Sequence, residues 1–228
     1  MIMNPKKFRH LVELALEEDI GKKDITTEAV IGDIKVKAVI TSKDEGIIAG
    51  LGVAKAVFQH LSKKIWFGEL VKDGNKVYKN QIIVHLEGKA KYILMAERTA
   101  LNFLNHLSGI ATLTSKYVEK VKPYECKILD TRKTTPLWRE LEKYAVKMGG
   151  GYNHRKGLYD MVLIKDNHLN LASSDFKMKK LVDSVRKKIP KGIKIEVEVN
   201  TLEELKKVYD CGVDVIMLDN MNLENIRK

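Results

Sequence analysis

The stretch CKILDTRKTTPLWRELEKYAVKMGGGYNHRKGLYDMVLIK, residues 126–165, predicts one complete β-α-β unit. The apolar run at 126–130 predicts a strand. Thr135-Pro136 predicts a helix start, because threonine is a good N-cap and proline fits the first helical position. Three glycines end that helix, and a second apolar run predicts a strand at 160–165. The inward-facing side chains of the helix are expected to be Leu137, Leu141, Tyr144, Ala145 and Met148.

The same alternation continues on the C-terminal side of this unit. Further strands are expected at 193–199 and 213–220, and helices at 174–188 and 201–212. Thr201 and Glu204 form a capping box that opens the second of these helices. Asn222 is a candidate cap for one more helix.

Four βα units in succession predict a parallel sheet, open or closed into a barrel. A barrel is favoured because a residue suited to chemistry ends each predicted strand: Asp130, Lys165, Glu198 and Asp219. Ligands bind at the carboxyl ends of the strands in such folds. The C-terminal half is therefore expected to carry the functional site.

The N-terminal half has a different pattern. Its expected elements are a helix at 5–18, a turn-rich segment at 21–30, a strand at 34–41, a turn and helix at 46–61, short β runs at 65–87 and a long amphipathic helix at 95–121. Gly109 interrupts the long helix and indicates a close packing contact or a break. The β runs resemble a carrier domain, but Lys72 and Lys89 lack a modification motif, which favours a structural sandwich.

The bulk properties narrow the class of protein. The chain has 228 residues, a formal net charge of +11, and no apolar run long enough to span a bilayer. The N-terminus lacks the features of a signal peptide, and Cys126 and Cys211 are far apart, so a cytoplasmic location is expected. The excess lysines are scattered and no nucleic-acid-binding motif is present, so neither a nucleic-acid nor a membrane partner is expected.

Six cationic or potentially cationic side chains lie in the loops between 130 and 168: Arg132, Lys133, His154, Arg155, Lys165 and His168. Arg132 and Lys133 follow a predicted strand directly, where a guanidinium fork and an ammonium suit an anion. His154 and Arg155 follow three glycines, which fits a flexible loop and a close backbone approach to an anion equally well. The grouping predicts a small, strongly anionic substrate.

The carboxylates at the later strand ends leave two readings open. Glu196 and Glu198 alternate with apolar residues, which fits an edge strand with one solvated face or a barrel interior. In an interior, each carboxylate needs a cationic partner or a metal. Asp219 either caps the next helix or meets a ribose hydroxyl or magnesium.

Several motifs together resemble the quinolinate phosphoribosyltransferase family, which comprises the decarboxylating nicotinate-nucleotide pyrophosphorylases. They are EEDIGKKDITTEA at 17–29, ERTALNFLNHLSGIAT at 97–112, the whole segment from Asp130 to His168, EVEV at 196–199 and MLDN at 217–220. The resemblance covers nearly the whole chain. It implies an N-terminal open α/β sandwich, residues 1–110, and an incomplete α/β barrel, residues 111–228.

The resemblance also implies an activity and a set of site residues. The reaction joins quinolinate to phosphoribosyl pyrophosphate with magnesium, and yields nicotinate mononucleotide, pyrophosphate and carbon dioxide. Arg132, Lys133, His154, Arg155 and Lys165 are then expected to line the site. The family works as a dimer or a multiple of dimers, and Arg98 is expected to reach into the partner's site.

The resemblance further assigns catalytic roles to Lys133, Glu198 and Asp219. Glu198 and Asp219 serve the ribose or bind magnesium, directly or through water, and the family's glutamate could instead align with Glu196. The sequence ends after four predicted strands, so the further barrel units that the family carries, with their phosphate-binding loop, are expected to be absent from it. The alternatives are a related type II phosphoribosyltransferase acting on another base, and a non-catalytic protein that binds anions or nucleic acid.

Overall fold

The computed structural model describes residues 8–171 and 178–228. The chain divides into two compact units, residues 1–154 and 155–228. No helix in the described part of the chain is long and apolar enough to cross a membrane. Both cysteines, Cys126 and Cys211, are free thiols.

The first unit is built on an antiparallel sheet. Its strands are β1 (Lys35–Thr41), β5 (Ile82–Lys89) and β3 (Trp66–Glu69), in the order β1-β5-β3. A second, two-stranded sheet pairs β2 (Gly46–Ile47) with β4 (Lys76–Val77). The predicted strand at 34–41 and the short β runs at 65–87 are thereby confirmed.

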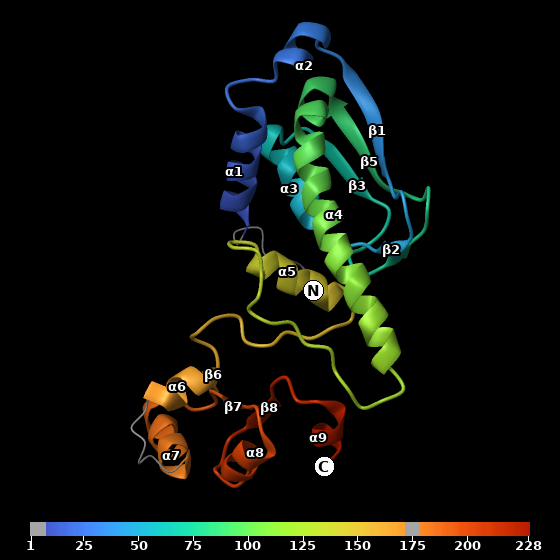
Figure 1. The fold of residues 1–228 in the computed structure, drawn as a ribbon. Coiled ribbons are helices and arrows are strands. Elements are labelled where there is room, and N and C mark those ends of the chain that lie inside the picture. The colour runs from blue at the N-terminus through green and yellow to red at the C-terminus, as the bar shows by residue number, and fades with distance from the viewer. Residues whose placement is uncertain (1–7, 172–177) are drawn as a thin grey trace. The chain divides into compact units, whose positions relative to one another are not determined.

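The described residues of the first unit form the helices α1 (Arg9–Ile20), α2 (Ile25–Val30), α3 (Leu51–Leu61), α4 (Ala90–Val121) and α5 (Arg139–Met148). Three of them, α1, α3 and α4, lie on one side of the sheet, whereas α2 lies at one end of it and α5 packs against α4 (Figure 1). Positions 5–7 of the first predicted helix lie outside the described residues. The segment expected only to turn contains α2, because the Asp24 side chain accepts a hydrogen bond from the Thr27 N–H at 2.9 Å and caps it.

The long helix α4 contributes many of the buried apolar side chains in the core of the first unit. Its apolar stripe, which includes Phe103, Leu104 and Leu107, packs in one cluster with α1, α3 and the sheet. The helix runs through Gly109 without a break, and a Cβ built at Gly109 would meet nothing within 4 Å. The prediction that Gly109 marks a break or a close contact is therefore wrong.

The start of α5 differs from the prediction. The helix begins at Arg139 rather than at Thr135-Pro136, because Leu137 adopts a left-handed φ of 67°, which no helical residue can have. Leu137 is also 83% exposed instead of facing inward. Tyr144 is half-buried as predicted, and its hydroxyl donates to the Asp73 carboxylate at 2.7 Å.

The strand predicted at 126–130 is also wrong. The segment forms only an isolated parallel bridge between Leu129 and Tyr152. Two hydrogen bonds make the bridge, from Tyr152 N–H to the Ile128 carbonyl at 2.8 Å and from Asp130 N–H to the Tyr152 carbonyl at 3.1 Å. The ladder does not extend into a strand, because the next residues, Asn153 and His154, donate hydrogen bonds to the Asp130 carboxylate instead.

Gly149→Ala is expected to destabilise the protein by about 1–3 kcal/mol, because the new methyl group would overpack the contact between α4 and α5. A Cβ at Gly149 would lie 2.3 Å from the Ala111 carbonyl oxygen and 2.7 Å from the Thr114 Cβ. Urea unfolding would measure the change. Gly109→Ala is the matched control and is expected to stabilise α4 by about 0.5–1 kcal/mol, as alanine does in a helix interior. Equal effects of the two substitutions would contradict the close contact.

The second unit is a three-stranded parallel sheet. Its strands are β6 (Val162–Ile164), β7 (Ile195–Val199) and β8 (Val215–Leu218), in the order β6-β7-β8. The helices are α6 (Asp166–Leu171), α7 (Met178–Lys188), α8 (Leu202–Val208) and α9 (Leu223–Arg227). The sequence did not predict α6, and α8 ends at Val208 instead of Gly212. Positions 174–177 of the predicted helix lie outside the described residues.

One face of this sheet is covered by α7 and α8. Ile195, Val197 and Val199 point to that face and form a core cluster with Val182 of α7 and Val208 of α8. The Thr201 side chain caps α8 by accepting from the Glu204 N–H at 3.1 Å, as predicted. Alternation along β7 consequently directs its two glutamates to the opposite face.

Candidate functional site

The register of the parallel strands gathers polar side chains at one edge of the second unit. Leu163 lies opposite Glu196, and Ile164 lies opposite Val197, so Lys165 follows into the position beside Glu198. The Lys165 Nζ contacts the Glu198 Oε2 at 2.5 Å. This pair sits at the carboxyl ends of β6 and β7, where the sequence predicted the site.

The two glutamates of β7 are buried. Glu196 is 3% exposed and Glu198 is 9% exposed. The alternative of an edge strand with a solvated face is excluded for the described part of the chain, since β7 lies between β6 and β8. For Glu198 the partner is Lys165, as the barrel interpretation requires.

Asp219 is the residue directly after β8, and β8 pairs with β7, the strand that carries Glu198. Its N–H donates to the Val199 carbonyl at 2.9 Å, which extends the ladder, and its Oδ2 accepts from the Asn220 side chain at 3.0 Å. Asp219 does not cap the following helix. Asn222 does, by accepting from the Asn225 N–H at 2.8 Å, so the candidate cap named from the sequence is confirmed.

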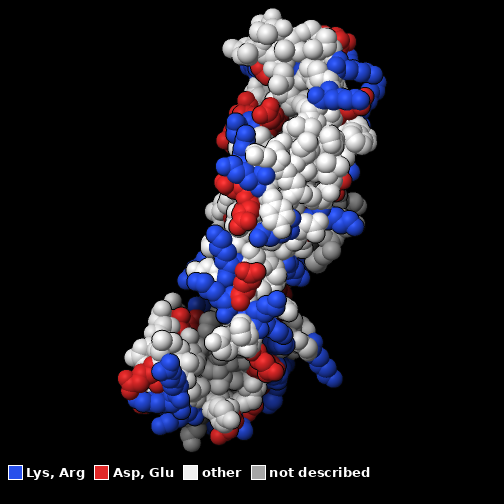
Figure 2. All heavy atoms as spheres, turned by 90° about the vertical axis from the view of Figure 1, so that its right-hand side faces the viewer, with Lys and Arg blue, Asp and Glu red and all other residues white. Residues whose placement is uncertain are grey.

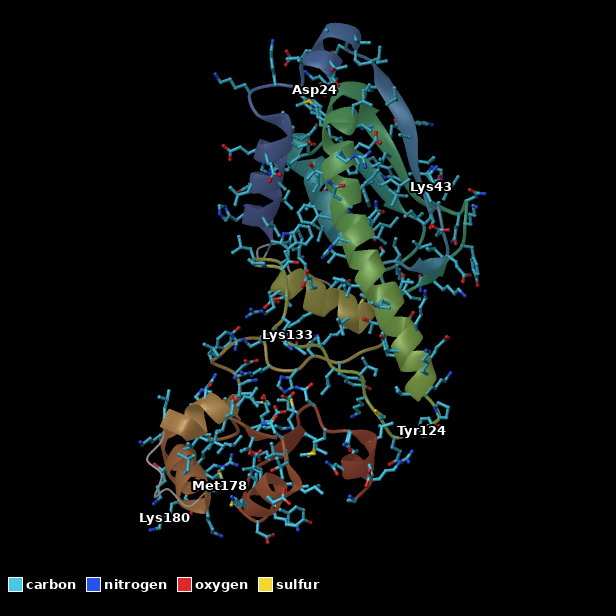
Figure 3. All side chains as sticks on the ribbon, viewed as in Figure 1. Asp24, Lys43, Tyr124, Lys133, Met178 and Lys180 are labelled. Atoms are coloured by element: carbon cyan, nitrogen blue, oxygen red, sulfur yellow. The ribbon has the colours of Figure 1, made fainter. Side chains whose placement is uncertain are left out.

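Arg132 and Lys133 lie in the loop before α5, in the first unit. The Arg132 Nε is buried, and it is the only buried side-chain nitrogen or oxygen in the described residues that has no hydrogen-bond partner. An unpaired buried donor costs free energy, so this nitrogen is suited to meet an acceptor on a ligand. Lys133, labelled in Figure 3, is exposed.

The remaining cationic side chains divide between the units. His154 ends the first unit, and its N–H donates to the Asp130 Oδ1 at 2.9 Å. Arg155 begins the second unit, where its Nη1 donates to the Met161 carbonyl at 3.4 Å. His168 holds the turn after β6, because its Nδ1 accepts from the Lys165 N–H at 3.0 Å.

Arg98 is exposed on α4, and it forms no ion pair with any described residue, including Glu97. An arginine on an exposed helix face commonly forms an ion pair with a nearby carboxylate, but Arg98 does not do so within the described residues. Arg98, Arg132, Lys133 and His154 belong to the first unit, and Arg155, Lys165, Glu198 and Asp219 to the second. A single cationic cluster of Arg132, Arg155 and Lys165 stays a prediction.

Sequence reasoning missed a set of buried polar residues around the loop that carries Arg132. Glu142 and Lys143, on α5, are 8% and 3% exposed. The Glu142 carboxylate accepts from the Thr135 N–H at 3.1 Å and pairs with the His106 Nε2 at 2.9 Å. Trp138 stacks on Phe103 with ring centroids 4.7 Å apart. Adjacent charged residues in a helix normally indicate a solvated face, so the sequence carried no signal for this burial.

The stability that Glu142 contributes is expected to be lost in acid. Burial raises the pKa of Glu142, but hydrogen bonds from Thr135 and His106 outweigh burial and hold it below the ordinary value of 4.5. A lowered pKa means that this stabilisation is complete above 4.5 and disappears as the pH falls through the folded-state pKa. Denaturant unfolding from neutral pH downward should therefore show Glu142→Gln about 1–3 kcal/mol less stable at neutral pH, with the difference shrinking in acid. If the difference in stability between Glu142→Gln and the unaltered protein did not change with pH, the ionised Glu142 carboxylate would not be the source of the stabilisation.

A metal ion would depend on few protein ligands here. No group of three or more His, Cys, Asp or Glu side chains in the described ranges could hold a metal ion by itself. Magnesium at phosphate-handling sites commonly uses one or two carboxylates and takes its other ligands from substrate and water. Glu198 and Asp219, at the ends of adjacent strands, fit that mode of binding.

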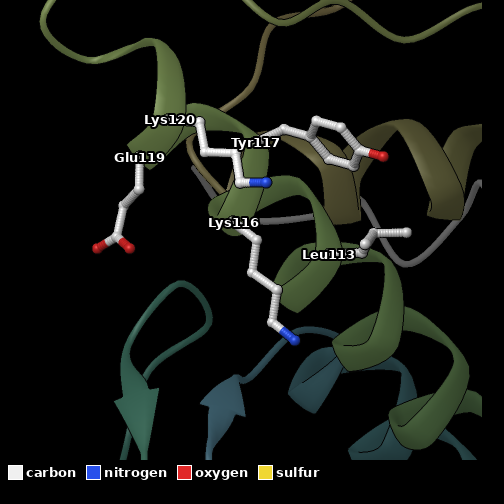
Figure 4. A pocket seen from close by; sticks show the side chains of 5 residues that line it. All are labelled: Leu113, Lys116, Tyr117, Glu119 and Lys120. Carbon is white, nitrogen blue, oxygen red and sulfur yellow. The ribbon is translucent and has the colours of Figure 1, made fainter.

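One surface pocket lies away from the residues that the sequence singled out. A pocket on the C-terminal half of α4 is lined by Leu113, Lys116, Tyr117, Glu119 and Lys120, none of which the sequence singled out (Figure 4). On the face shown in Figure 2, Lys and Arg side chains are interspersed with Asp and Glu. That distribution agrees with the expectation that the positive charge is scattered.

Comparison with known proteins assigns the family. Residues 24–108 match the domain described as quinolinate phosphoribosyl transferase, N-terminal domain, and residues 110–228 match the C-terminal domain. The chain is 41% identical over 225 residues to a probable nicotinate-nucleotide pyrophosphorylase (carboxylating) of Bacillus subtilis, covering 99% of this chain and 77% of that protein. It is 42% identical over 221 residues to the probable enzyme of that name from Methanocaldococcus jannaschii, covering 96% and 75%.

A solved structure agrees with these matches. The nicotinate-nucleotide pyrophosphorylase from Francisella tularensis superposes with a TM-score of 0.93 at 40% identity, covering 99% of this chain and 79% of that one. The match extends over both the antiparallel sheet of the first unit and the parallel sheet of the second. The chain belongs to the quinolinate phosphoribosyl transferase family.

Proposed function

We propose that this protein transfers the phosphoribosyl group of phosphoribosyl pyrophosphate to quinolinate, with decarboxylation. The products are nicotinate mononucleotide, pyrophosphate and carbon dioxide, and the reaction serves NAD biosynthesis. The observation that carries the proposal is the match to both domains of the family, over residues 24–108 and 110–228. The names of the relatives from Bacillus subtilis and Methanocaldococcus jannaschii support the same reaction.

The cationic loops suit the charge of these substrates. Quinolinate carries two carboxylates, and phosphoribosyl pyrophosphate carries a phosphate and a pyrophosphate. The Arg132 side chain offers a planar fork with a buried, unpartnered Nε, which favours a carboxylate as its acceptor. Lys133, His154, Arg155 and Lys165 supply the further positive charge.

The carboxylates at the strand ends suit the transition state. Departure of pyrophosphate leaves positive charge on the ribose C1, which a nearby carboxylate stabilises. Glu198 is better placed than Glu196 for this role, because it lies nearer the carboxyl end of β7 and is held there by Lys165. Lys133 and Asp219 are the other proposed catalytic residues. The bond between C2 and its carboxylate then breaks, carbon dioxide leaves, and the electron pair stays on C2 beside the cationic ring nitrogen until C2 takes a proton from water.

We further propose magnesium as the cofactor. Glu198 and Asp219 would hold it, directly or through water, together with oxygen atoms of phosphoribosyl pyrophosphate. Magnesium would neutralise charge on the departing pyrophosphate. The protein is proposed to act in the cytoplasm as a homodimer or a multiple of dimers. Arg98, exposed on α4 without an ion pair to a described residue, is proposed to complete the partner's site.

The direct test is release of labelled carbon dioxide from carboxyl-labelled quinolinate in the presence of phosphoribosyl pyrophosphate and magnesium. The proposed function predicts release that requires all three components. Nicotinate offered in place of quinolinate separates this activity from that of a related phosphoribosyltransferase. Turnover of nicotinate without turnover of quinolinate would overturn the proposal.

Arg132→Lys is expected to weaken quinolinate binding roughly 10- to 100-fold, because an ammonium cannot reproduce a two-pronged contact with a carboxylate. Calorimetric titration with quinolinate alone would measure the loss. The control is Lys187→Arg, an exchange between the same residue types at an exposed position on α7. Unchanged affinity in Arg132→Lys would show that this side chain does not bind a carboxylate.

A further inference from the structure

A buried ion pair lies beneath the two loops of the first unit that carry candidate site residues. The Lys143 Nζ of α5 contacts the Asp130 Oδ1, and the two side chains are 3% and 7% exposed. The same Nζ donates to the His154 carbonyl at 3.1 Å. Lys143 thus joins the start of the loop at 130–135 to the end of the loop at 152–154.

Asn153 completes the network. Its side-chain nitrogen donates to the Asp130 Oδ2 at 2.5 Å and to the Lys143 carbonyl at 2.8 Å. The His154 N–H donates to the Asp130 Oδ1 at 2.9 Å. Asp130 therefore accepts from Lys143, Asn153 and the backbone of His154, and its carboxylate is satisfied on both oxygens.

The network is poorly explained by stability alone. Taking two charges out of water is costly, and an apolar pair of similar volume often stabilises a core as well as or better than a buried ion pair. Fully satisfied polar networks instead favour one geometry, because any displacement leaves a buried charge unpaired. Here that geometry concerns Asp130, two residues before Arg132, and Asn153, one residue before His154.

We propose that Lys143, Asp130 and Asn153 are positioning residues, which fix the loop bearing Arg132 and Lys133 relative to His154. They touch no substrate and act through those three side chains on the binding of quinolinate. The effect on quinolinate rests on the proposed function. The immobilisation of the two loops does not rest on it.

Three variants test the proposal against a simple structural role. Lys143→Met removes the ammonium, and Asp130→Asn/Lys143→Met removes both charges, so that no carboxylate is left buried and unpaired. Asn153→Ala keeps the ion pair and removes only neutral donors, and it carries the test if the first two variants do not fold. Lys120→Met, exposed on α4 in the same unit, is the matched control. Thermal unfolding, hydrogen exchange and steady-state kinetics are measured for each, well below its unfolding temperature.

The double variant is expected to recover most of the thermal stability lost in Lys143→Met. It should nevertheless keep faster hydrogen exchange at 131–135 and 152–154 and a KM for quinolinate raised roughly 10- to 100-fold, with a smaller change in kcat. The control should match the unaltered protein. Recovery of exchange protection and KM together with stability would show a purely structural role and overturn the proposal. If the unaltered protein does not turn over quinolinate, the proposed function fails, and the exchange pattern alone decides whether the network holds the loops.

Discussion

Lys165→Met is expected to lower kcat/KM at least about 100-fold, the largest effect of any single substitution in the second unit. The Lys165 Nζ lies 2.5 Å from the Glu198 Oε2, and Glu198 is only 9% exposed. The substitution removes a cation that would face the anionic substrates. It also leaves the carboxylate that we propose to stabilise the ribose cation without its partner, so the Glu198 side chain is free to turn away from the ribose.

Loss of stability must be separated from loss of catalysis in this experiment. Removing one member of a fully buried ion pair costs about 3–5 kcal/mol, but Lys165 is 40% exposed, so a smaller cost is expected. Lys165→Met/Glu198→Gln removes both charges and is expected to restore stability without restoring turnover. Lys187→Met, an exposed lysine on α7, is the matched control and should leave both unchanged. Turnover that returns in the double variant would show that the pair is structural.

The position of this pair could be predicted because β-structure has a simple period. Alternation along 193–199 placed Glu196 and Glu198 on one face, and a central strand forces that face to find partners for them. A lysine ending the neighbouring strand was the available cation. The sequence left a solvated edge strand and a buried strand open, with a cation or a metal as partner in the second case, and the central place of β7 decides for the buried strand.

The loop between 130 and 139 could not be predicted in the same way. Thr135-Pro136 is a good local signal for a helix start, but the Thr135 N–H is instead bound by Glu142, and Trp138 is held against Phe103. These contacts come from other parts of the fold and override local preference. They also draw Glu142 and Lys143 inside, although charged residues at successive helix positions normally indicate exposure.

The apolar run at 126–130 shows a second limit of sequence patterns. An apolar run indicates that a segment can pair, but the extent of pairing depends on the partner. Here the partner is Tyr152, and the pairing ends after this one bridge. The next two residues, Asn153 and His154, donate hydrogen bonds to the Asp130 carboxylate instead. The carboxylate expected to serve chemistry at a strand end is thus occupied in holding two loops.

A 1:1 mixture of Arg98→Ala and Lys133→Ala proteins is expected to recover about a quarter of the unaltered activity, provided that the protein is a symmetric dimer. Each variant alone should lose activity about 100-fold, because each lacks a cation at every site. In the mixture, half of the dimers contain one subunit of each kind. In such a dimer one site has an intact Lys133 from its own subunit and an intact Arg98 from the partner, while the other site lacks both.

The proposed place of Arg98 in the partner's site follows from the family resemblance, and its exposure on α4 agrees with it. Arg98 is exposed on α4 and forms no ion pair with a described residue of its own chain, so its guanidinium is available to a second subunit.

Subunit exchange must be verified, for example by mass spectrometry of subunits with different isotope labels, before activity is compared. Each variant mixed with itself is the control for handling. If exchange is complete and activity stays at the level of the separate variants, Arg98 and Lys133 serve the same subunit's site, or Arg98 lies outside the site. Recovery near a quarter would place a residue of each subunit in one site, and the dimer would then be required for catalysis itself.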